Sequence, residues 1–285
     1  MRIMESLRTL IVEHILLITR VRSWIETTRK QVSHIRSLRA FPVTRKKYFY
    51  TTETDEATKV LVLESFYYGN YDNKDSPPTF ELHLDGNFWV TVNASGPDVV
   101  VHDAIYNVKR GAISVCVARI YPNQAPFINA LDFGGLKPGK YSHIGQNQAL
   151  LLVKRANYGR NPTGHDRPFS NIVEDDPPYE LFTTAVTPPS NSTTKLSLNI
   201  GLPTKQVLIY ITTFFSEVLD LKNTTDKRSF QIYIDNKSYS NPIIPLFEGE
   251  TEEYITDITA SSETSFKLVS ASNSTLPPLI NGMEV

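Results

Sequence analysis

Thr79-Phe-Glu-Leu-His-Leu-Asp-Gly-Asn87 is the stretch that decides the fold of this chain. Its apolar residues alternate with polar ones, which is the pattern of a β-strand with one buried and one solvent-facing side. Asp85-Gly86 then supplies a tight turn, because glycine adopts positive φ without a Cβ clash. The alternation resumes after the turn and predicts a β-hairpin. The side chains expected on its buried face are Phe80, Leu82, Leu84, Phe88, Val90 and Val92.

The same phrase occurs a second time as Ser229-Phe-Gln-Ile-Tyr-Ile-Asp-Asn-Lys237, 150 residues further along the chain. Another pair of phrases, Pro126-Phe-Ile-Asn-Ala-Leu-Asp-Phe133 and Pro278-Leu-Ile-Asn-Gly-Met-Glu-Val285, is separated by 152 residues. Two repeated phrases at nearly one offset indicate an internal duplication. We therefore expect two copies of one β-rich module of ordinary domain size, with each pair of phrases on equivalent strands.

The overall composition excludes several classes of protein. The 285 residues carry a formal net charge of −1, which argues against a nucleic-acid-binding protein. Cys116 is the single cysteine, so an intrachain disulfide and a cysteine metal cluster are both excluded. The six histidines show no metal-ligand spacing, and no apolar run reaches the ~18 residues of a membrane span. We expect neither a cofactor nor a metal.

The N-terminal segment, residues 1–40, differs from the rest of the chain in charge and periodicity. Residues 1–47 have a net charge of +8, against −9 for the remainder. Apolar residues recur at helical spacing from Leu7 to Ile25, which predicts a basic amphipathic helix. The segment has no clean signal-peptide cleavage site. Association of this helix with a membrane surface is the weaker alternative.

The chain after residue 47 reads as short strands separated by turns, and no helical pattern is convincing there. We therefore predict an all-β fold of two sandwiches or jelly rolls, with a helical N-terminal extension. The expected divisions are a basic segment of residues 1–40, a first module of residues 41–135 and a second module of residues 141–285. The second module has about 90 residues before its copy of the hairpin, so the first module is expected to lack its opening strands.

Several of these phrases resemble the malectin-like ectodomain of plant receptor-like kinases, many of which also carry leucine-rich repeats. The resemblance lies in Phe66-Tyr-Tyr-Gly-Asn-Tyr-Asp72, Pro77-Pro-Thr-Phe-Glu-Leu-His-Leu84, Asn87-Phe-Trp-Val90 and Pro126-Phe-Ile-Asn-Ala-Leu131. It implies two tandem malectin-like β-sandwiches, of the jelly-roll, galactose-binding-like type, on the extracellular face of the plasma membrane. It also implies a carbohydrate of the cell wall or of glycans, or a secreted peptide, as ligand, together with a co-receptor.

The chain departs from the family pattern at two motifs. Arg45-Lys-Lys-Tyr48 stands where the family has Arg-Asn-Cys-Tyr, so the cysteine is missing. His165-Asp-Arg-Pro-Phe169 matches the Asp-Arg-x-Trp motif of the second module only loosely. The kinase and transmembrane signatures of the family are not found in these residues, so membrane association would depend on the family's transmembrane region or on the N-terminal helix.

Aromatic and polar side chains gather after the strand that ends near Phe66. Aromatic faces stack on sugar rings, while amides and carboxylates accept or donate hydrogen bonds to hydroxyls. Trp89 is opposite in phase to its neighbours and is expected to be an exposed platform or a contact between modules. The alternative is that these aromatics pack the core. The candidate ligand-binding residues are Tyr67, Tyr68, Asn70, Tyr71, Asp72 and Trp89.

Asn-x-Ser/Thr sequences, the acceptors of N-linked glycans, recur along the chain. The copy at the tip of the second hairpin is the best candidate, because a hairpin tip leaves room for a glycan. The candidate glycosylation sites are Asn93, Asn191, Asn223, Asn236 and Asn273.

The function that these patterns favour is non-enzymatic binding of an extracellular ligand. One alternative is a carbohydrate-active β-sandwich enzyme with a carboxylate pair. The acidic stretches Glu174-Asp-Asp176 and Glu252-Glu253 are expected to be solvated loops rather than such a pair. A second alternative is a structural fragment without a ligand. No residue is expected to be catalytic.

Overall fold

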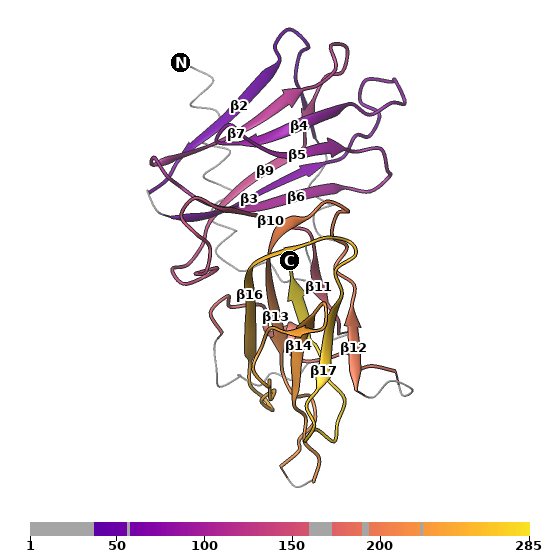
Figure 1. Ribbon diagram of the computed structural model, residues 1–285. Helices are drawn as coiled ribbons and strands as arrows, with labels where there is room; N and C mark the ends of the chain where they lie inside the picture. The colour runs from indigo at the N-terminus through magenta and orange to yellow at the C-terminus, as the bar shows by residue number, and fades with distance from the viewer. Residues whose placement is uncertain (1–36, 56–57, 160–172, 190–193, 223–224) are drawn as a thin grey trace. The chain divides into compact units, whose positions relative to one another are not determined.

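The computed structural model describes residues 37–55, 58–159, 173–189, 194–222 and 225–285 (Figure 1). Within these residues the chain forms strands β1 to β18 and one short 3-10 helix, and it contains no α-helix. The described residues divide into two compact units. Module 1 comprises residues 37–138 and Ile144–Leu151, and module 2 comprises Gly139–His143 and Leu152–Val285. The predicted all-β class with two tandem modules is confirmed.

Module 1 is built from two four-stranded antiparallel sheets and one short strand pair. The first sheet has the order β10-β6-β3-β9, the second has the order β2-β7-β4-β5, and β1 pairs with β8. The strands are β1 (Arg39–Ala40), β2 (Lys47–Glu53), β3 (Lys59–Phe66), β4 (Thr79–Leu84), β5 (Asn87–Asn93), β6 (Val100–Asn107), β7 (Ala112–Arg119), β8 (Phe127–Ile128), β9 (Ala130–Gly135) and β10 (Ala149–Leu151).

Module 2 also has two four-stranded antiparallel sheets, of order β11-β18-β13-β16 and β12-β17-β14-β15. Its 3-10 helix η2 spans Tyr179–Phe182. The strands are β11 (Arg155–Asn157), β12 (Lys195–Leu198), β13 (Val207–Phe215), β14 (Phe230–Ile234), β15 (Lys237–Ser238), β16 (Thr251–Ala260), β17 (Phe266–Ser270) and β18 (Gly282–Glu284).

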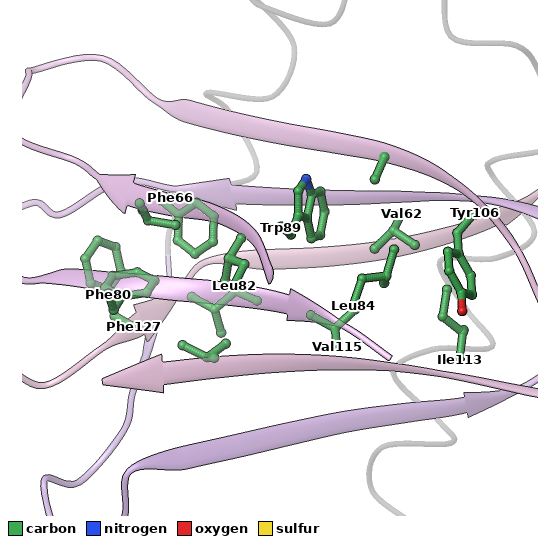
Figure 2. Close-up of a cluster of buried hydrophobic side chains, with 14 of the residues drawn as sticks. Val62, Phe66, Phe80, Leu82, Leu84, Trp89, Tyr106, Ile113, Val115 and Phe127 are labelled. Atoms are coloured by element: carbon green, nitrogen blue, oxygen red, sulfur yellow. The ribbon is translucent and has the colours of Figure 1, made fainter. Parts of the chain in front are cut away.

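The core of module 1 lies between its two sheets, as Figure 2 shows. Alternate residues of each strand supply it, because successive side chains of a strand point to opposite faces. Phe66, Phe80 and Phe127 are fully buried, and their ring centroids lie 5.5–6.1 Å apart in edge-to-face arrangements. Burial of three phenylalanine side chains contributes roughly 1.5–3 kcal/mol each.

The second strand of the first hairpin differs from the sequence prediction. The pairing of β4 with β5 is interrupted by a β-bulge, in which Leu82 lies opposite Val90 and His83 opposite Phe88. The extra residue, Trp89, therefore turns into the core and is only 5% exposed, whereas Phe88 is 58% exposed. A bulge inserts one residue and reverses the alternation beyond it. The expectation of a buried Phe88 was wrong for this reason. The expectation of Trp89 as an exposed platform or a contact between modules was wrong too, since Trp89 lies in the core of module 1.

The aspartates in the turns of the two hairpins have the same backbone conformation and make the same two hydrogen bonds. Asp85 has φ 47°, its amide donates to the carbonyl of Ser114 at 2.8 Å, and its Oδ1 accepts from the Ser114 amide at 2.7 Å. Asp235 has φ 48° and makes the same two bonds with Ser265, at 3.0 and 2.8 Å. A short acidic side chain suits this position, because it tolerates the left-handed region and bonds backbone groups locally.

An asparagine before β9 joins three backbone segments of module 1. The backbone amide of Asn129 donates to the carbonyl of Ser65 at 3.1 Å. Its side-chain Oδ1 accepts from the amide of Tyr67 at 2.7 Å, and its Nδ2 donates to the carbonyl of Ser37 at 3.1 Å. One side chain therefore ties the end of β3 to the segment that leads into β1.

Asn281, before β18, does the same in module 2. Its backbone amide donates to Phe214 at 3.1 Å, and its Oδ1 accepts from the amide of Ser216 at 2.7 Å. Its Nδ2 donates to the carbonyls of Phe182 and Thr184 at 3.3 and 2.9 Å. The same spacing of partners in both copies confirms the predicted duplication, and we call these two residues the asparagine clamps.

The two modules differ at the edges of two equivalent sheets, β10-β6-β3-β9 in module 1 and β11-β18-β13-β16 in module 2. In module 2, β11 pairs with the outer side of β18. In module 1 the equivalent strand β9 pairs with β3, no described strand lies on its other side, and β10 adds to the opposite edge beside β6. The predicted lack of opening strands concerns residues that precede Ser37 and lie outside the described part of the chain, so it stays a prediction. The pairing of β10 with β6 gives module 1 a strand from residues that we had assigned to module 2.

The predicted amphipathic helix falls mostly on residues 1–36, which lie outside the described residues. The described end of the predicted segment is a strand, since Arg39–Ala40 forms β1 and pairs with β8. Phe41 follows directly and is 2% exposed in the core of module 1. Residues 37–40 therefore belong to module 1 rather than to a separate extension.

We predict that Asn281→Ala lowers the free energy of unfolding by about 2–4 kcal/mol, because it leaves three backbone groups, the amide of Ser216 and the carbonyls of Phe182 and Thr184, without this partner. Asn129→Ala should cost less, since Asn129 is only half-buried while Asn281 is fully buried. Urea unfolding of both variants, followed by circular dichroism, measures the difference. Equal losses below about 1 kcal/mol would show that the clamps do not stabilise the modules.

Candidate functional site

The predicted ligand loop connects β3 to β4 and is held in shape by its own side chains. Gly69, Asn70, Asn73 and Asp75 all have φ between 49° and 54°. Asparagine and aspartate are the non-glycine residues that enter this region most readily. Asn70 Oδ1 accepts from the amide of Asp75 at 2.9 Å, and Asn70 Nδ2 donates to the Asp75 carboxylate. The polar atoms of Asn70 are therefore engaged inside the loop.

Tyr68 and Asp72 form a second internal contact. Tyr68 is 8% exposed, and its hydroxyl donates to the Asp72 carboxylate and to Asn70 Oδ1, the latter at 3.2 Å. Desolvation opposes ionisation of Asp72, but the hydrogen bonds from Tyr68 and Lys74 outweigh it and lower the pKa of this carboxyl. Asp72 is therefore a charged acceptor that its own loop already uses.

Tyr71 packs against the core. Its ring lies 5.5 Å from those of Tyr68 and Phe127, and its hydroxyl donates to the carbonyl of Ala125 at 2.8 Å. Burial raises the pKa of Tyr71 to about 12. Tyr67, by contrast, is 39% exposed. The structure thus brings the predicted loop residues together, but Tyr67 is the one that offers a ring to solvent, and the sugar site in this loop stays a prediction.

The described glycosylation candidates are all exposed. Asn93 ends β5, Asn236 has φ 67° in the turn between β14 and β15, and Asn273 lies in the loop after β17. Asn191 and Asn223 lie outside the described residues. Glycosylation at these positions stays a prediction.

Two acidic stretches that the sequence suggested were solvated meet in module 2. Asp175 is 6% exposed, and its amide donates to Glu252 Oε2 at 3.3 Å. The amide of Tyr141 and the hydroxyl of Thr212 both donate to the Asp175 carboxylate, at 2.6 and 3.4 Å. Glu252 belongs to β16, a strand that the sequence reading missed. The expectation of solvated loops was wrong, because a strand and a loop 77 residues apart bury these groups together.

Asp175 and Glu252 do not have the arrangement of a glycosidase pair. Burial raises the pKa of Glu252 to about 8 and also raises the pKa of Asp175, and the two side chains are hydrogen-bonded to each other. Two carboxyl groups in such contact share a proton. Glycosidase carboxyls stand roughly 5–10 Å apart, with the sugar between them. The contact therefore fits a buried structural pair.

Glu64 is a buried acid in the core of module 1. It is 0% exposed, and neither carboxyl oxygen has a hydrogen-bond partner among the described residues. It lies opposite His102 of β6, whose Nε2 is also buried without a described partner. Burial raises the pKa of Glu64 to about 8 and lowers the pKa of His102. Burial therefore favours the neutral form of both side chains.

The described residues contain no cluster of three or more His, Cys, Asp or Glu side chains that could hold a metal ion. The same residues include no helix with the length and apolar character of a membrane span. Cys116 is buried, and desolvation raises the pKa of its thiol.

Comparison with known proteins identifies the family. The malectin-like domain model matches residues 18–171 and 162–285. The chain belongs to the malectin-like domain family. The two matched segments follow the two modules of the fold, so the resemblance seen in the sequence motifs is confirmed.

Relatives of this malectin-like chain are found in Arabidopsis thaliana. The uncharacterized protein At1g24485 is 27% identical over 279 residues, which cover 89% of this chain and 55% of that protein. The probable LRR receptor-like serine/threonine-protein kinases PAM74 and At1g51810 are 28% and 30% identical, over 86% and 87% of this chain and 31% of each kinase. The chain thus spans between a third and about half of the length of these relatives.

Solved structures share the fold. A chain of the crystal structure of the plant peptide RALF23 in complex with FER and LLG2 matches with a TM-score of 0.62 at 15% identity, over 87% of this chain and 81% of that one. The ANX1 ectodomain from Arabidopsis thaliana matches with a TM-score of 0.63 at 12% identity, over 87% of this chain and 81% of that one. These likenesses establish a tandem malectin-like fold.

We predict that module 1 loses stability as the pH rises from about 4.5 to 8. The pKa of Glu64 lies higher in the folded state, about 8, than its usual value of 4.5, so the folded state binds more protons across this range. Thermal unfolding of the wild type and of Glu64→Gln, at steps from pH 5 to 9, measures the effect. The variant should lack the part of the pH dependence due to Glu64.

Asp175 and Glu252 titrate in the same direction, so the difference between wild type and Glu64→Gln is the quantity to follow. Asp175→Asn serves as the control, because it changes the buried pair of module 2 and leaves Glu64 in place. If Glu64→Gln and the wild type show the same slope with pH, Glu64 is not a buried, protonated acid.

Proposed function

We propose that this chain is a non-enzymatic ligand-binding protein of the extracellular side of the plasma membrane, and that its ligand is a secreted peptide. The observation that carries the proposal is the tandem malectin-like fold, which spans 87% of the chain and 81% of the FER chain in the RALF23 complex. Receptor-like kinases among the relatives support an extracellular setting. LLG2 in the same complex supports a co-receptor as a further partner.

Three acidic groups with raised pKa values, Asp175, Glu252 and Glu64, support binding rather than catalysis. Asp175 and Glu252 are in contact with each other, and Glu64 lies inside a hydrophobic core. General acid–base chemistry needs a group within hydrogen-bond reach of a substrate. None of these three carboxyls is presented in that way.

The proposal predicts saturable, one-to-one binding of a secreted plant peptide. Isothermal titration of the purified chain with a library of such peptides, including synthetic RALF23, measures it. Sequence-scrambled versions of each hit are the control and should not bind. A library without a hit would contradict the proposal, and so would turnover of a cell-wall oligosaccharide that a single acid-to-amide substitution abolishes.

A further inference from the structure

The outer edge of β2 in module 1 carries backbone groups that no described strand uses. β2 ends the sheet β2-β7-β4-β5 and pairs with β7 over all of its seven residues without a bulge (Figure 1). The carbonyl of Lys46 and the amide of Thr54, at its two ends, are hydrogen-bonded on the β7 side at 2.8 and 3.0 Å. Backbone groups alternate in direction along a strand, so every second residue between these two faces away from β7. The residues with an outward amide and carbonyl are Lys47, Phe49, Thr51 and Glu53.

The other edge strands in the described part of the chain are shorter or interrupted. A bulge interrupts the pairing of β5, at the opposite edge of the same sheet, and also the pairing of β16. β9 has six residues, and the remaining edge strands have two to four. Short strands and bulges protect the edge of a sheet, because a long, regular edge accepts a further strand. β2 lacks both kinds of protection.

The charged side chains at this edge have opposite signs at the two ends of β2. Arg45 and Lys47 lie at its beginning, Glu53 and Asp55 lie at its end, and all four are exposed. None of the four forms an ion pair with another described residue. Such charges oppose pairing with an arbitrary strand and favour a strand whose charges run in the reverse direction.

A second copy of β2, laid antiparallel to the first, has this reversed order of charges. In the register that sets Lys47 of one copy opposite Glu53 of the other, Arg45 lies opposite Asp55, and two-fold symmetry forms each contact twice. The residues with outward backbone groups then face one another, and each opposite pair exchanges two hydrogen bonds. A shift by two residues in either direction sets a basic residue opposite an uncharged one, and a parallel arrangement in register sets like charges opposite each other.

The same register gives a partner to the exposed aromatic side chain of this strand. Phe49 is 62% exposed on the face of the sheet away from the core. In the antiparallel pair it lies opposite Thr51 of the other copy and diagonal to the other Phe49. Diagonal neighbours on one face of a sheet are within reach of aromatic side chains. The two phenylalanine rings therefore cover each other at the centre of the paired edges.

We propose that this protein forms a symmetric homodimer in which the β2 edges of two copies pair antiparallel and join their sheets into one. The free backbone groups supply the hydrogen bonds, and the charges at the two ends select the partner and the register. The proposal goes beyond the peptide-binding function and does not depend on it.

An extended peptide of another protein is the alternative occupant of the edge. Peptides add to open sheet edges through the same backbone groups. To match the charges of β2 in the antiparallel direction, such a peptide must carry basic residues before acidic ones at the same spacing. A second copy has this sequence by identity, so the charges of the described residues favour the homodimer.

The test is sedimentation velocity of the full chain over a series of concentrations, with Thr51→Pro and Thr51→Ala as matched variants. The amide of Thr51 faces away from β7, so proline removes a donor of the dimer and no hydrogen bond of the sheet. Both variants lose the contact between the hydroxyls of Thr51 and Ser114, which are 3.3 Å apart. We expect the wild type and Thr51→Ala to dimerise, and Thr51→Pro to dimerise roughly tenfold more weakly or less. Thermal unfolding confirms that both variants are folded.

Charge reversal tests the register. Lys47→Glu and Glu53→Lys each set like charges opposite each other twice, so each variant alone should dimerise roughly tenfold more weakly than the wild type. An equimolar mixture of the two variants restores opposite charges at both places and should form a heterodimer. High salt should weaken the wild-type dimer, because it screens these exposed ion pairs.

Three outcomes would overturn the proposal. The first is a chain that stays monomeric at every concentration, and the second is a dimer that Thr51→Pro leaves intact. The third is a mixture of Lys47→Glu and Glu53→Lys that associates no better than either variant alone. The titration with peptides measures ligand binding separately, so a failure of the homodimer leaves the proposed function standing, and the reverse also holds.

Discussion

The side-chain amides of Asn129 and Asn281 join the segments that close each module. The segments that lead into the strands of a β-sandwich can be buried only if their backbone groups find hydrogen-bond partners. An asparagine side chain both accepts and donates, so a single residue can serve two segments at once. In each copy it accepts from the amide that follows one strand and donates to a carbonyl of the entering segment.

The sequence predicted those parts of the fold that depend on local alternation. The hairpins at Phe80 and Phe230 and the clamps at Asn129 and Asn281 are short phrases whose repetition could be read directly. The strand β16 was missed, because its acidic residues do not alternate with apolar ones in the usual way. Trp89 was misplaced, because a bulge depends on the partner strand and leaves no signal in its own sequence.

The candidate site was less predictable than the fold, because it depends on contacts between distant residues. The chemistry of Tyr68, Tyr71 and Asp72 was visible in the sequence, but the hydrogen bonds from Tyr68 to Asp72 and from Tyr71 to the carbonyl of Ala125 were not. The contact between Asp175 and Glu252 was hidden for the same reason, since a loop and a strand that are 77 residues apart contribute one residue each.

The central claim, that both modules are copies of one framework closed by the same amide contact, is tested most directly by residue-resolved amide hydrogen exchange of the unmodified chain. The amides of Tyr67 and Ser216 donate to the clamps at 2.7 Å in both copies, although each follows the end of its strand. The account predicts that both amides exchange as slowly as the neighbouring strand amides of their own modules. Exchange of either amide at the rate of an exposed loop would contradict it.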